Sequence, residues 1–328
     1  MKRTTQRTLL AIVCLAAAAG AYAQSAENYP TRPVRMIIPF APGGASDFAG
    51  RILQAKLGEE LGQQVVADNR TGASGNVGVE IAARANPDGY TILVGNVGTM
   101  AINPSIFPKF PIKPLRDLIG VTLFVDIPGA LAVNASVPAA TVKEFIAYAK
   151  ARPGQLNYGS AGAGSAQRLA FEFFMHKAGI NLVHIPYKGG AGAATLAILG
   201  GEVAATMLTV ASFIPHLKGG KVKVLAVIAP SRVSQLPDTP TMAESGFPEL
   251  LLGSWQGVAV PAGTPRAIVN KLYSAVIKTM GDPETVKRFK TGGAEVVTSK
   301  SPDEYAAFLR TQNEFWAKIV KQTGATAE

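Results

Sequence analysis

Residues 34–47 read VRMIIPFAPGGASD and decide the fold class of this chain. The stretch opens with an apolar run, Val34 to Phe40, which only Arg35 interrupts, and such a run is typical of a strand buried on both faces. A glycine turn follows at residues 41–44, and Asp47 then begins a stretch whose apolar residues recur at helical spacing. A strand, a glycine turn and a helix in this order are the unit of a parallel α/β sheet.

The same unit recurs along the chain. Two more glycine turns, TGASG at residues 71–75 and SAGAGS at residues 160–165, each follow a short strand-like run and precede a helical pattern. The sequence therefore predicts an α/β protein with two lobes, each a mostly parallel sheet flanked by helices, and a cleft between them. We expect the first lobe to comprise residues 24–125 and 254–328, and the second lobe residues 126–253.

Turn residues and apolar runs predict where the individual elements lie. Thr141, Asp282 and Ser301 are expected at helix starts, and Thr264 is expected to cap a helix whose first residue is Pro265. Strands are expected at residues 34–40, 65–67, 90–95, 118–125, 131–133, 156–158, 182–185, 204–208, 222–228, 254–260 and 295–297.

Composition excludes several classes of protein. Hydrophobic residues make up 48% of the 328 residues and charged residues 16%, a balance that excludes a disordered chain. The formal net charge is +10, but the basic residues are scattered and are not interleaved with aromatic side chains. We therefore expect no nucleic-acid partner, whereas a mild positive field favours a small anionic ligand.

The first 23 residues have the pattern of a secretory signal peptide. Three basic residues precede an uncharged apolar run at residues 9–20, and residues 21–23 read AYA, a small-x-small cleavage site. A transmembrane anchor is the alternative, but it needs about 20 apolar residues. We expect cleavage before Gln24 and export to the periplasm.

The single cysteine, Cys14, lies inside this leader. A lipoprotein would begin at Cys14 after a small residue, but Val13 precedes it and the apolar run continues beyond it. The exported chain is therefore expected to carry no cysteine. This excludes cysteine nucleophiles, zinc–cysteine sites and iron–sulfur clusters, and it suits a domain that is stabilised by its core alone.

Motifs of common enzyme classes are absent from the sequence. It contains no H-E-x-x-H, no G-x-x-x-x-G-K-[ST] and no G-x-S-x-G. His176, His184 and His216 are scattered and are expected at the surface or in packing. We expect no catalytic residue, no metal and no cofactor, although carboxylates that meet only in space stay open as an alternative.

The three glycine turns predict an anion site. The first turns of a helix offer unpaired backbone N–H groups and a partial positive charge, and glycine lets a ligand approach that backbone closely. Serine and threonine hydroxyls add further donors. Each turn taken alone is compatible with a tight turn and a good cap, but three such turns at the carboxyl ends of strands favour a binding site.

Three residues or motifs near the turns have open alternatives. Asp47 is compatible with two roles, a contact to an amine or hydroxyl of a ligand and a cap of its own helix. Lys188 can pair with an anion or be a solvated turn residue. Gly162-x-Gly164 is compatible with a dinucleotide fold, but that fold wants an acidic residue about 20 positions later, where residues 182–184 read LVH.

Several motifs together resemble the extracytoplasmic solute receptors of tripartite tricarboxylate transporters, often called Bug receptors. No single motif is specific, but their order and spacing span the chain after the leader. The matching stretches are YP at 29–30, RP at 32–33, PFAPGG at 39–44 with Asp47, NR at 69–70, GA at 72–73, GN at 75–76, NPDGY at 86–90, YGSAG at 158–162, GS at 164–165, HIPYKG at 184–189 and PAGTP at 261–265.

This resemblance implies a two-lobed periplasmic binding protein, similar to type II binding proteins, that closes on a ligand in the interlobe cleft. It places a ligand carboxylate between the turns at 41–44 and 160–165, partly through waters. Residues 202–209 depart from the family pattern, so the identity of the ligand is not transferred from any relative. The candidate ligand-binding residues are Phe40, Ala41, Pro42, Gly43, Gly44, Asp47, Ser74, Asn96, Ser160, Ala161, Gly162, Ala163, Gly164, Ser165, Tyr187 and Thr209.

The expected function is capture of a small carboxylate, an organic acid or a carboxylated aromatic. The resemblance implies delivery of this ligand to the membrane subunits of a transporter, with a sensor kinase as a further partner, and we expect a monomer. The alternative is an exported α/β enzyme that acts on a small anion. Stoichiometric binding with return of an unchanged ligand distinguishes the receptor from the enzyme.

Overall fold

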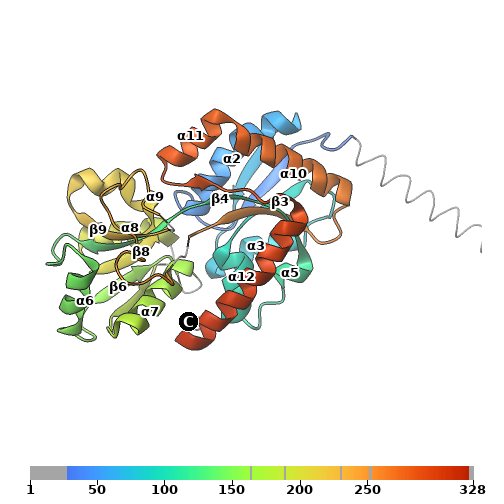
Figure 1. Cartoon of the computed structure of the whole chain (residues 1–328). Helices are drawn as coiled ribbons and strands as arrows, with labels where there is room; N and C mark the ends of the chain where they lie inside the picture. Colours follow the sequence, from blue (N-terminus) through green and yellow to red (C-terminus); the bar gives the residue numbers. More distant parts are fainter. Residues whose placement is uncertain (1–27, 163–164, 188–189, 230, 251–252, 325–328) are drawn as a thin grey trace, which may run out of the picture.

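The computed structural model describes residues 28–162, 165–187, 190–229, 231–250 and 253–324, and it has two lobes (Figure 1). The leader, Cys14 and the expected cleavage before Gln24 therefore lie outside the described residues. Within the described ranges, no helix is both long enough and apolar enough to cross a membrane.

The sheet of the first lobe has the strand order β11-β4-β10-β3-β1-β2. β1 is parallel to β2 and β3, and β10 is antiparallel to both β3 and β4. Thus β1 to β4 run in one direction, and β10 and the short β11 run against them. The bounds are β1 Val34–Ile38, β2 Val65–Asn69, β3 Thr91–Asn96, β4 Leu118–Asp126, β10 Gln256–Pro261 and β11 Glu295–Val296.

The sheet of the second lobe repeats this plan with the order β7-β6-β8-β5-β9. β6 is parallel to β7 and β8, and β5 is antiparallel to β8 and β9. Strands of one direction prevail in both sheets, as predicted, but each sheet also holds an inserted antiparallel strand. The bounds are β5 Gly129–Asn134, β6 Asn157–Ser160, β7 Val183–Pro186, β8 Ala205–Thr209 and β9 Val222–Ile228.

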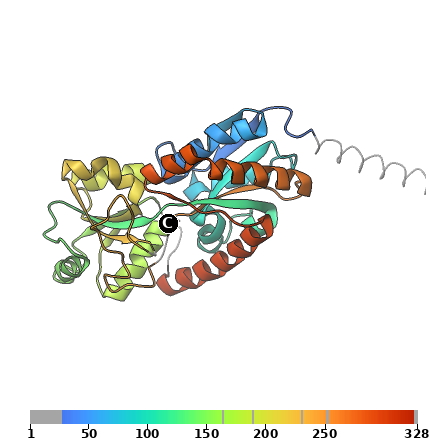
Figure 2. The same ribbon diagram turned by 45° about the horizontal axis from the view of Figure 1, so that its top comes forward.

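Helices flank both sheets (Figures 1 and 2). Those beside the first sheet are α2 Ala45–Leu61, α3 Asn76–Ala83, α10 Arg266–Gly281, α11 Pro283–Thr291 and α12 Pro302–Thr323. Those of the second lobe are α6 Val142–Lys150, α7 Ala166–Ala178 and α8 Gly190–Gly200. Short helical segments, which the sequence analysis did not predict, are η1 Ala73–Gly75, η2 Gly98–Ile102, α4 Asn103–Ile106, α5 Pro114–Asp117, α9 Val210–Phe213 and η3 Ile214–Gly219.

Three of the expected helix starts are confirmed, and one is wrong by a residue. The side chains of Thr141, Asp282 and Ser301 accept hydrogen bonds from the first turns of α6, α11 and α12. Thr264 does not cap α10: its hydroxyl donates to the carbonyl of Pro261 at 2.7 Å, and the helix begins at Arg266 after Pro265.

Two apolar clusters cover the two faces of the first sheet. Met36 and Ile38 of β1 pack in the cluster with α2 and α10, whereas Ile37 between them packs in the cluster with α3 and α12. This alternation follows from the side-chain geometry of a strand. The second cluster also includes Ala166 and Leu169 of α7, so the lobes share apolar contacts between α7 and α12.

The chain crosses between the lobes twice, at residues 126–128 and 253–255. The two crossing segments lie side by side, because the N–H of Ser254 donates to the carbonyl of Ile127 at 2.9 Å. Asp126 lies at this crossing with one carboxylate oxygen, Oδ1, buried and without a hydrogen-bond partner among the described residues. Burial raises the pKa of Asp126 to about 6, although the N–H of Ile127 donates to the carboxylate and opposes this shift.

Replacing Asp126 tests the burial of this carboxyl. Because its folded-state pKa is raised above the ordinary 3.8, the folded state binds the proton more tightly, and this stabilisation is lost as the pH rises through about 6. As the pH rises from 4 to 7, the free energy of unfolding of wild type should fall. We expect this fall to be about 1–3 kcal/mol larger than the fall in Asp126→Asn.

Chemical denaturation at pH 4, 5.5 and 7 measures this difference. Asp238→Asn, at an exposed carboxylate, is the matched control and should follow wild type. If the free energies of unfolding of wild type and Asp126→Asn differ by the same amount at pH 4 and at pH 7, the burial of the carboxyl is contradicted.

Candidate anion-binding site

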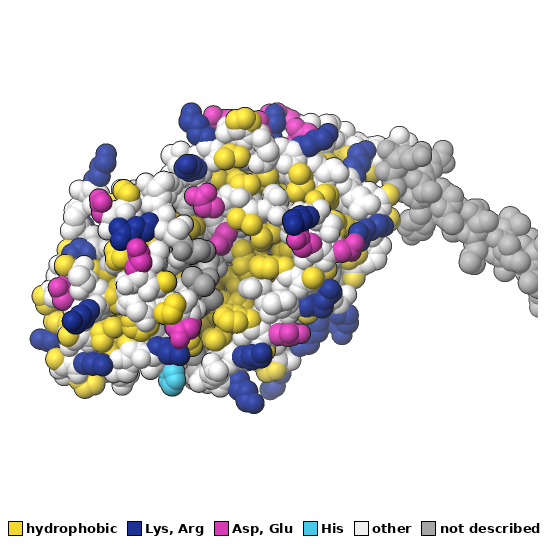
Figure 3. Space-filling model, viewed as in Figure 1, with side chains coloured by type: hydrophobic (Ala, Val, Ile, Leu, Met, Phe, Trp, Pro, Cys, Tyr) yellow, Lys and Arg dark blue, Asp and Glu magenta, His cyan; other side chains and the backbone are white. Residues whose placement is uncertain are grey.

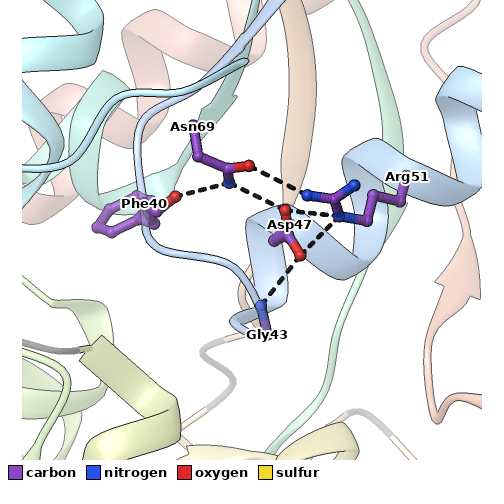
Figure 4. A network of polar contacts seen from close by, with 5 residues as sticks. All are labelled: Phe40, Gly43, Asp47, Arg51 and Asn69. Carbon is purple, nitrogen blue, oxygen red and sulfur yellow. Dashed lines mark hydrogen bonds and ion pairs between the residues drawn. The ribbon is translucent and has the colours of Figure 1, made fainter. Parts of the chain in front are cut away.

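The first glycine turn joins the carboxyl end of β1 to the start of α2. Gly43 has a φ of +84°, a conformation that residues with a side chain adopt only at a cost. Its N–H donates to Oδ2 of Asp47 at 3.0 Å (Figure 4). Both carboxylate oxygens of Asp47 also accept a hydrogen bond from Nε of Arg51, each at an N–O distance of 2.9 Å.

Asn69, at the end of β2, ties this network to the other end of the turn. Its Nδ2 donates to the carbonyl of Phe40 at 2.8 Å and to Oδ1 of Asp47 at 2.9 Å. Nη2 of Arg51 donates to Oδ1 of Asn69 at 3.2 Å. The backbone is therefore held at both Phe40 and Gly43 (Figure 4).

Asp47 makes the contacts of a group that holds its own turn. It lies in the first turn of α2, with Gly44 at the N-cap, and is 4% exposed. Burial alone would raise the pKa of Asp47, but hydrogen bonds from Arg51, Gly43 and Asn69 hold this pKa below its usual value. The N–H of Gly43 is already donated to Asp47, so the donors left in this turn are the N–H groups that open α2.

The second turn has an unusual backbone. Residues 72–75 all have positive φ, including Ala73 and Ser74, and such conformations cost about 1–3 kcal/mol each in a residue with a side chain. Asn103 holds the turn, because its Nδ2 donates to the carbonyl of Ser74 at 3.0 Å. A Cβ on Gly75 would lie 2.6 Å from Cγ2 of Thr99 and 3.0 Å from Cζ of Phe40, so the first two turns pack together.

The third turn lies between β6 and α7 in the second lobe. Oγ of Ser160 accepts the N–H of Gly162 at 3.2 Å and lies 2.7 Å from Nε2 of His184. Ser165 caps α7 by accepting the N–H of Arg168 at 3.2 Å. The predicted site residues Ala163 and Gly164, and Lys188, lie outside the described residues.

His184 is held neutral behind this turn. Its ring stacks on that of Tyr158 with the centroids 4.9 Å apart. Burial and the nearby charge of Arg168 lower the pKa of His184 to about 4. Arg168 itself is paired with Glu172 through a distance of 2.7 Å between Nε and Oε1. His184 is therefore a packing residue, as the sequence analysis expected, but it also orients Ser160.

The second and third turns face each other across the two lobes. A Cβ on Gly162 would lie 3.8 Å from Oγ of Ser74. A second contact between the lobes lies at Gly293, where a Cβ would meet Ile214 at 2.7 Å. Gln235 also donates to the carbonyl of Lys290. The fold thus brings turns from both lobes to one place.

The other predicted site residues divide into two groups. Nδ2 of Asn96 donates to Oγ of Ser46 at 3.1 Å behind the first turn, and the N–H of Tyr187 donates to the carbonyl of Ser160 at 3.0 Å. The hydroxyl of Thr209, by contrast, forms a hydrogen bond with the hydroxyl of Ser212 at 2.9 Å, and this bond does not involve any of the glycine turns. Ala41, Pro42 and Ala161 belong to the first and third turns by sequence.

Sequence analysis did not assign roles to several residues that shape the site. Gln256 is fully buried, and its Oε1 accepts the hydroxyl of Ser46 at 2.8 Å. Because this contact joins β10 to α2, no local pattern could have predicted it. Arg51 stands four residues after Asp47, a helical ion-pair spacing that was available as a signal.

Among the described residues, Arg51 beside the first turn and Arg168 beside the third turn are each paired with an acid on the same helix, and Arg70 beside the second turn is paired with Asp68 of β2. Arg51 pairs with Asp47 on α2, and Arg168 pairs with Glu172 on α7. On the face shown in Figure 3, other Lys and Arg side chains are spread over both lobes with acidic ones among them. In the ranges that the structure covers, no three His, Cys, Asp or Glu side chains gather to hold a metal ion.

Comparison with known proteins identifies the family. The pattern of the tripartite tricarboxylate transporter family receptor matches residues 49–325. The chain belongs to this receptor family. The resemblance that the sequence motifs indicated is thereby confirmed, and the chain is a receptor by family.

Individual relatives agree with this assignment. The receptor is 36% identical to Protein BugT of Bordetella pertussis over 321 residues, which cover 97% of this chain and 98% of BugT. Among solved structures, the periplasmic binding protein BugD is 35% identical, with a TM-score of 0.85 over 92% of this chain and all of BugD. The R. palustris protein Rpa4515 with adipate is 32% identical, with a TM-score of 0.87 over 91% of this chain and 99% of that protein.

The neutral His184 predicts a pH dependence of stability in the receptor. Because its folded-state pKa is about 4, the unfolded chain binds the proton first as the pH falls below 6.5, so folding loses stability between about pH 6.5 and 4. We expect this loss to be about 1–2 kcal/mol, less than the shift alone implies, because the ring is partly exposed and solvent screens it.

His184→Gln should abolish this loss, since the amide still reaches Ser160 but does not titrate. Urea denaturation at pH 4.5 and 7 measures it, with His176→Gln at an exposed histidine as control. A pH profile of His184→Gln that matches wild type would contradict the assigned role.

Proposed function

We propose that this receptor captures a small carboxylate in the cleft between its lobes and delivers it to the membrane subunits of a tripartite tricarboxylate transporter. One observation carries the proposal: the second and third glycine turns, one from each lobe, meet with 3.8 Å between Oγ of Ser74 and a Cβ placed on Gly162. The adipate bound by the relative Rpa4515 supports a dicarboxylate as the ligand class.

The proposed binding mode uses backbone groups rather than a free cation. The N–H groups that open α2 and α7 have no partner within their helices and carry a partial positive charge. Arg51 and Arg168 are already paired, so the dipoles and N–H groups are left to hold the ligand carboxylate. We propose Phe40 to Gly44, Ser74, Ala161, Gly162 and Ser165 as the residues nearest the ligand.

The competing function, an exported enzyme, has one observation in its favour. Ser160 and His184 form a close hydroxyl–imidazole pair at 2.7 Å, which is the contact between a nucleophile and its base. Ser160, however, is only 1% exposed, and the lowered pKa of His184 makes it a weak base. Among the described residues, no carboxylate bonds to the ring of His184 to orient it. These features favour the receptor over the enzyme.

The proposed location and partners follow from the relatives and the leader. BugD is a periplasmic binding protein, and the expected signal peptide directs this chain to the same compartment. We propose that the receptor acts as a monomer. Its main partner is the membrane transporter, and a sensor kinase is a second partner that recognises the ligand-bound receptor.

Isothermal titration with adipate, malate and citrate tests the function. We expect one equivalent of at least one acid to bind and to be recovered unchanged. The dissociation constant should change by less than about threefold between 50 and 500 mM salt, because no free cation is engaged. Release of a chemically altered ligand would overturn the receptor function, and the absence of binding across these acids would contradict the proposed ligand class.

A matched pair of glycine variants sharpens this test. Gly162→Val should abolish binding, because the branched side chain would fill the space beside Ser74. Gly246→Val also forces a branched side chain into a strongly positive φ, +94° against +117° at Gly162, but it has open space around it, so it should bind as wild type. Ser160→Ala should weaken binding by only about 0.5–1.5 kcal/mol.

Ligand should also draw the lobes together. We propose that residues 24–125 with 254–328 and residues 126–253 move as two bodies about the paired crossings at 126–128 and 253–255. Small-angle scattering should then record a smaller radius of gyration with saturating ligand than without it. An unchanged radius at saturation would count against closure while leaving binding intact.

A further inference from the structure

We propose that Asp47 is a positioning residue: its carboxylate, neutralised by Arg51, sets the backbone of the first glycine turn so that the N–H groups opening α2 face the ligand. Asp47 itself does not contact the ligand. The inference rests on the proposed carboxylate-binding function and assigns one of the two roles that the sequence left open.

The oxygens of Asp47 are fully engaged within the protein. Oδ2 accepts the N–H of Gly43 at 3.0 Å, and Oδ1 accepts Nδ2 of Asn69 at 2.9 Å. Nε of Arg51 donates to both oxygens, and the Asp47 side chain is only 6% exposed. A ligand amine or hydroxyl would have to displace one of these partners, as Figure 4 makes plain.

The same contacts fix the shape of the turn. The bond from Gly43 to Asp47 spans the turn and reaches one residue further back than the N-cap contact of a capping box, and Asn69 holds the carbonyl of Phe40. The first bond of α2 runs from the N–H of Phe48 to the carbonyl of Gly44 at 2.9 Å. The N–H groups of residues 45–47 precede it and are left for an anion.

The charge of Asp47 explains why Arg51 is needed beside it. A carboxylate close to an anion site repels its ligand unless a cation neutralises it. Arg51 lies on the solvent side, with its side chain 51% exposed, and covers the buried Asp47. Arg51 thus acts on the ligand through Asp47, without touching it, and its loss would leave a negative charge at the start of α2.

The pair Arg84 and Glu80 provides a matched control. It has the same four-residue spacing, with a distance of 2.8 Å between Nε and Oε1, but it lies at the end of α3, with the side chain of Arg84 63% exposed and that of Glu80 39% exposed. Among the described residues, the carboxylate of Glu80 bonds to Arg84 and to no glycine turn. Arg84→Gln therefore removes an equivalent ion pair without touching the first turn.

The experiment measures adipate binding by isothermal titration to wild type and four variants. Arg51→Gln should weaken binding tenfold or more, and Arg84→Gln should not weaken it. Asp47→Asn keeps an oxygen for Gly43 and should lose less than tenfold. Adding Asp47→Asn to Arg51→Gln should recover binding to within about threefold of wild type, because the uncompensated charge is gone.

Direct contact with the ligand predicts a different order. Asp47→Asn alone would then lose at least as much as Arg51→Gln, and the double variant would bind no better than either single variant. That order overturns the proposal. Circular dichroism confirms that each variant is folded.

A second measurement tests the positioning without any ligand. In nitrogen-15 spectra, the Gly43 amide proton should move upfield in Asp47→Ala, because it loses a charged acceptor, and should stay in place in Arg84→Gln. An unmoved Gly43 signal in Asp47→Ala overturns the proposal. If wild type binds none of adipate, malate and citrate, the proposed ligand class fails while the amide signal still decides the role of Asp47.

Discussion

The proposed site depends on one property of helices, namely that the first N–H groups of a helix have no partner inside it. α2 and α7 each begin directly after a strand and a glycine turn, in the two lobes. Arg51 and Arg168 are paired with Asp47 and Glu172, and in the proposed binding mode the backbone groups supply the positive potential that attracts the ligand. Glycine keeps the approach to them open.

Much of the fold was predictable because buried parallel strands have a strong sequence signal. The run at 34–40 was correctly predicted to be a buried strand, although β1 ends at Ile38, because both faces of β1 are covered, with Ile37 in one cluster and Met36 and Ile38 in the other. The helix starts at Thr141, Asp282 and Ser301 were predictable because each depends on a cap residue that is adjacent to its helix in the sequence. The short helices at 98–106 were missed, because they follow β3 in a run that has no helical spacing of its own.

The site was predictable only as a set of turns. The contact of Ser46 with Gln256 joins segments far apart in the chain, and no sequence pattern reports such a pair. The positive φ values of Ala73 and Ser74 depend on Asn103 and on the packing of Gly75, which only the folded structure supplies. The role of Asp47 was ambiguous because a helix cap and a ligand contact need the same residue type, and its partner Asn69 comes from another strand.

The position of β10 has a consequence for how the chain folds. β10 lies between β3 and β4, so the middle of the first sheet stays open until residues 256–261 are available. The second lobe, in contrast, draws its strands from one continuous stretch. Pairings between distant segments form slowly, because the intervening chain must be ordered first. The sheet of the first lobe therefore cannot be completed until residues 256–261, which follow the strands of the second lobe in the sequence, have paired with β3 and β4.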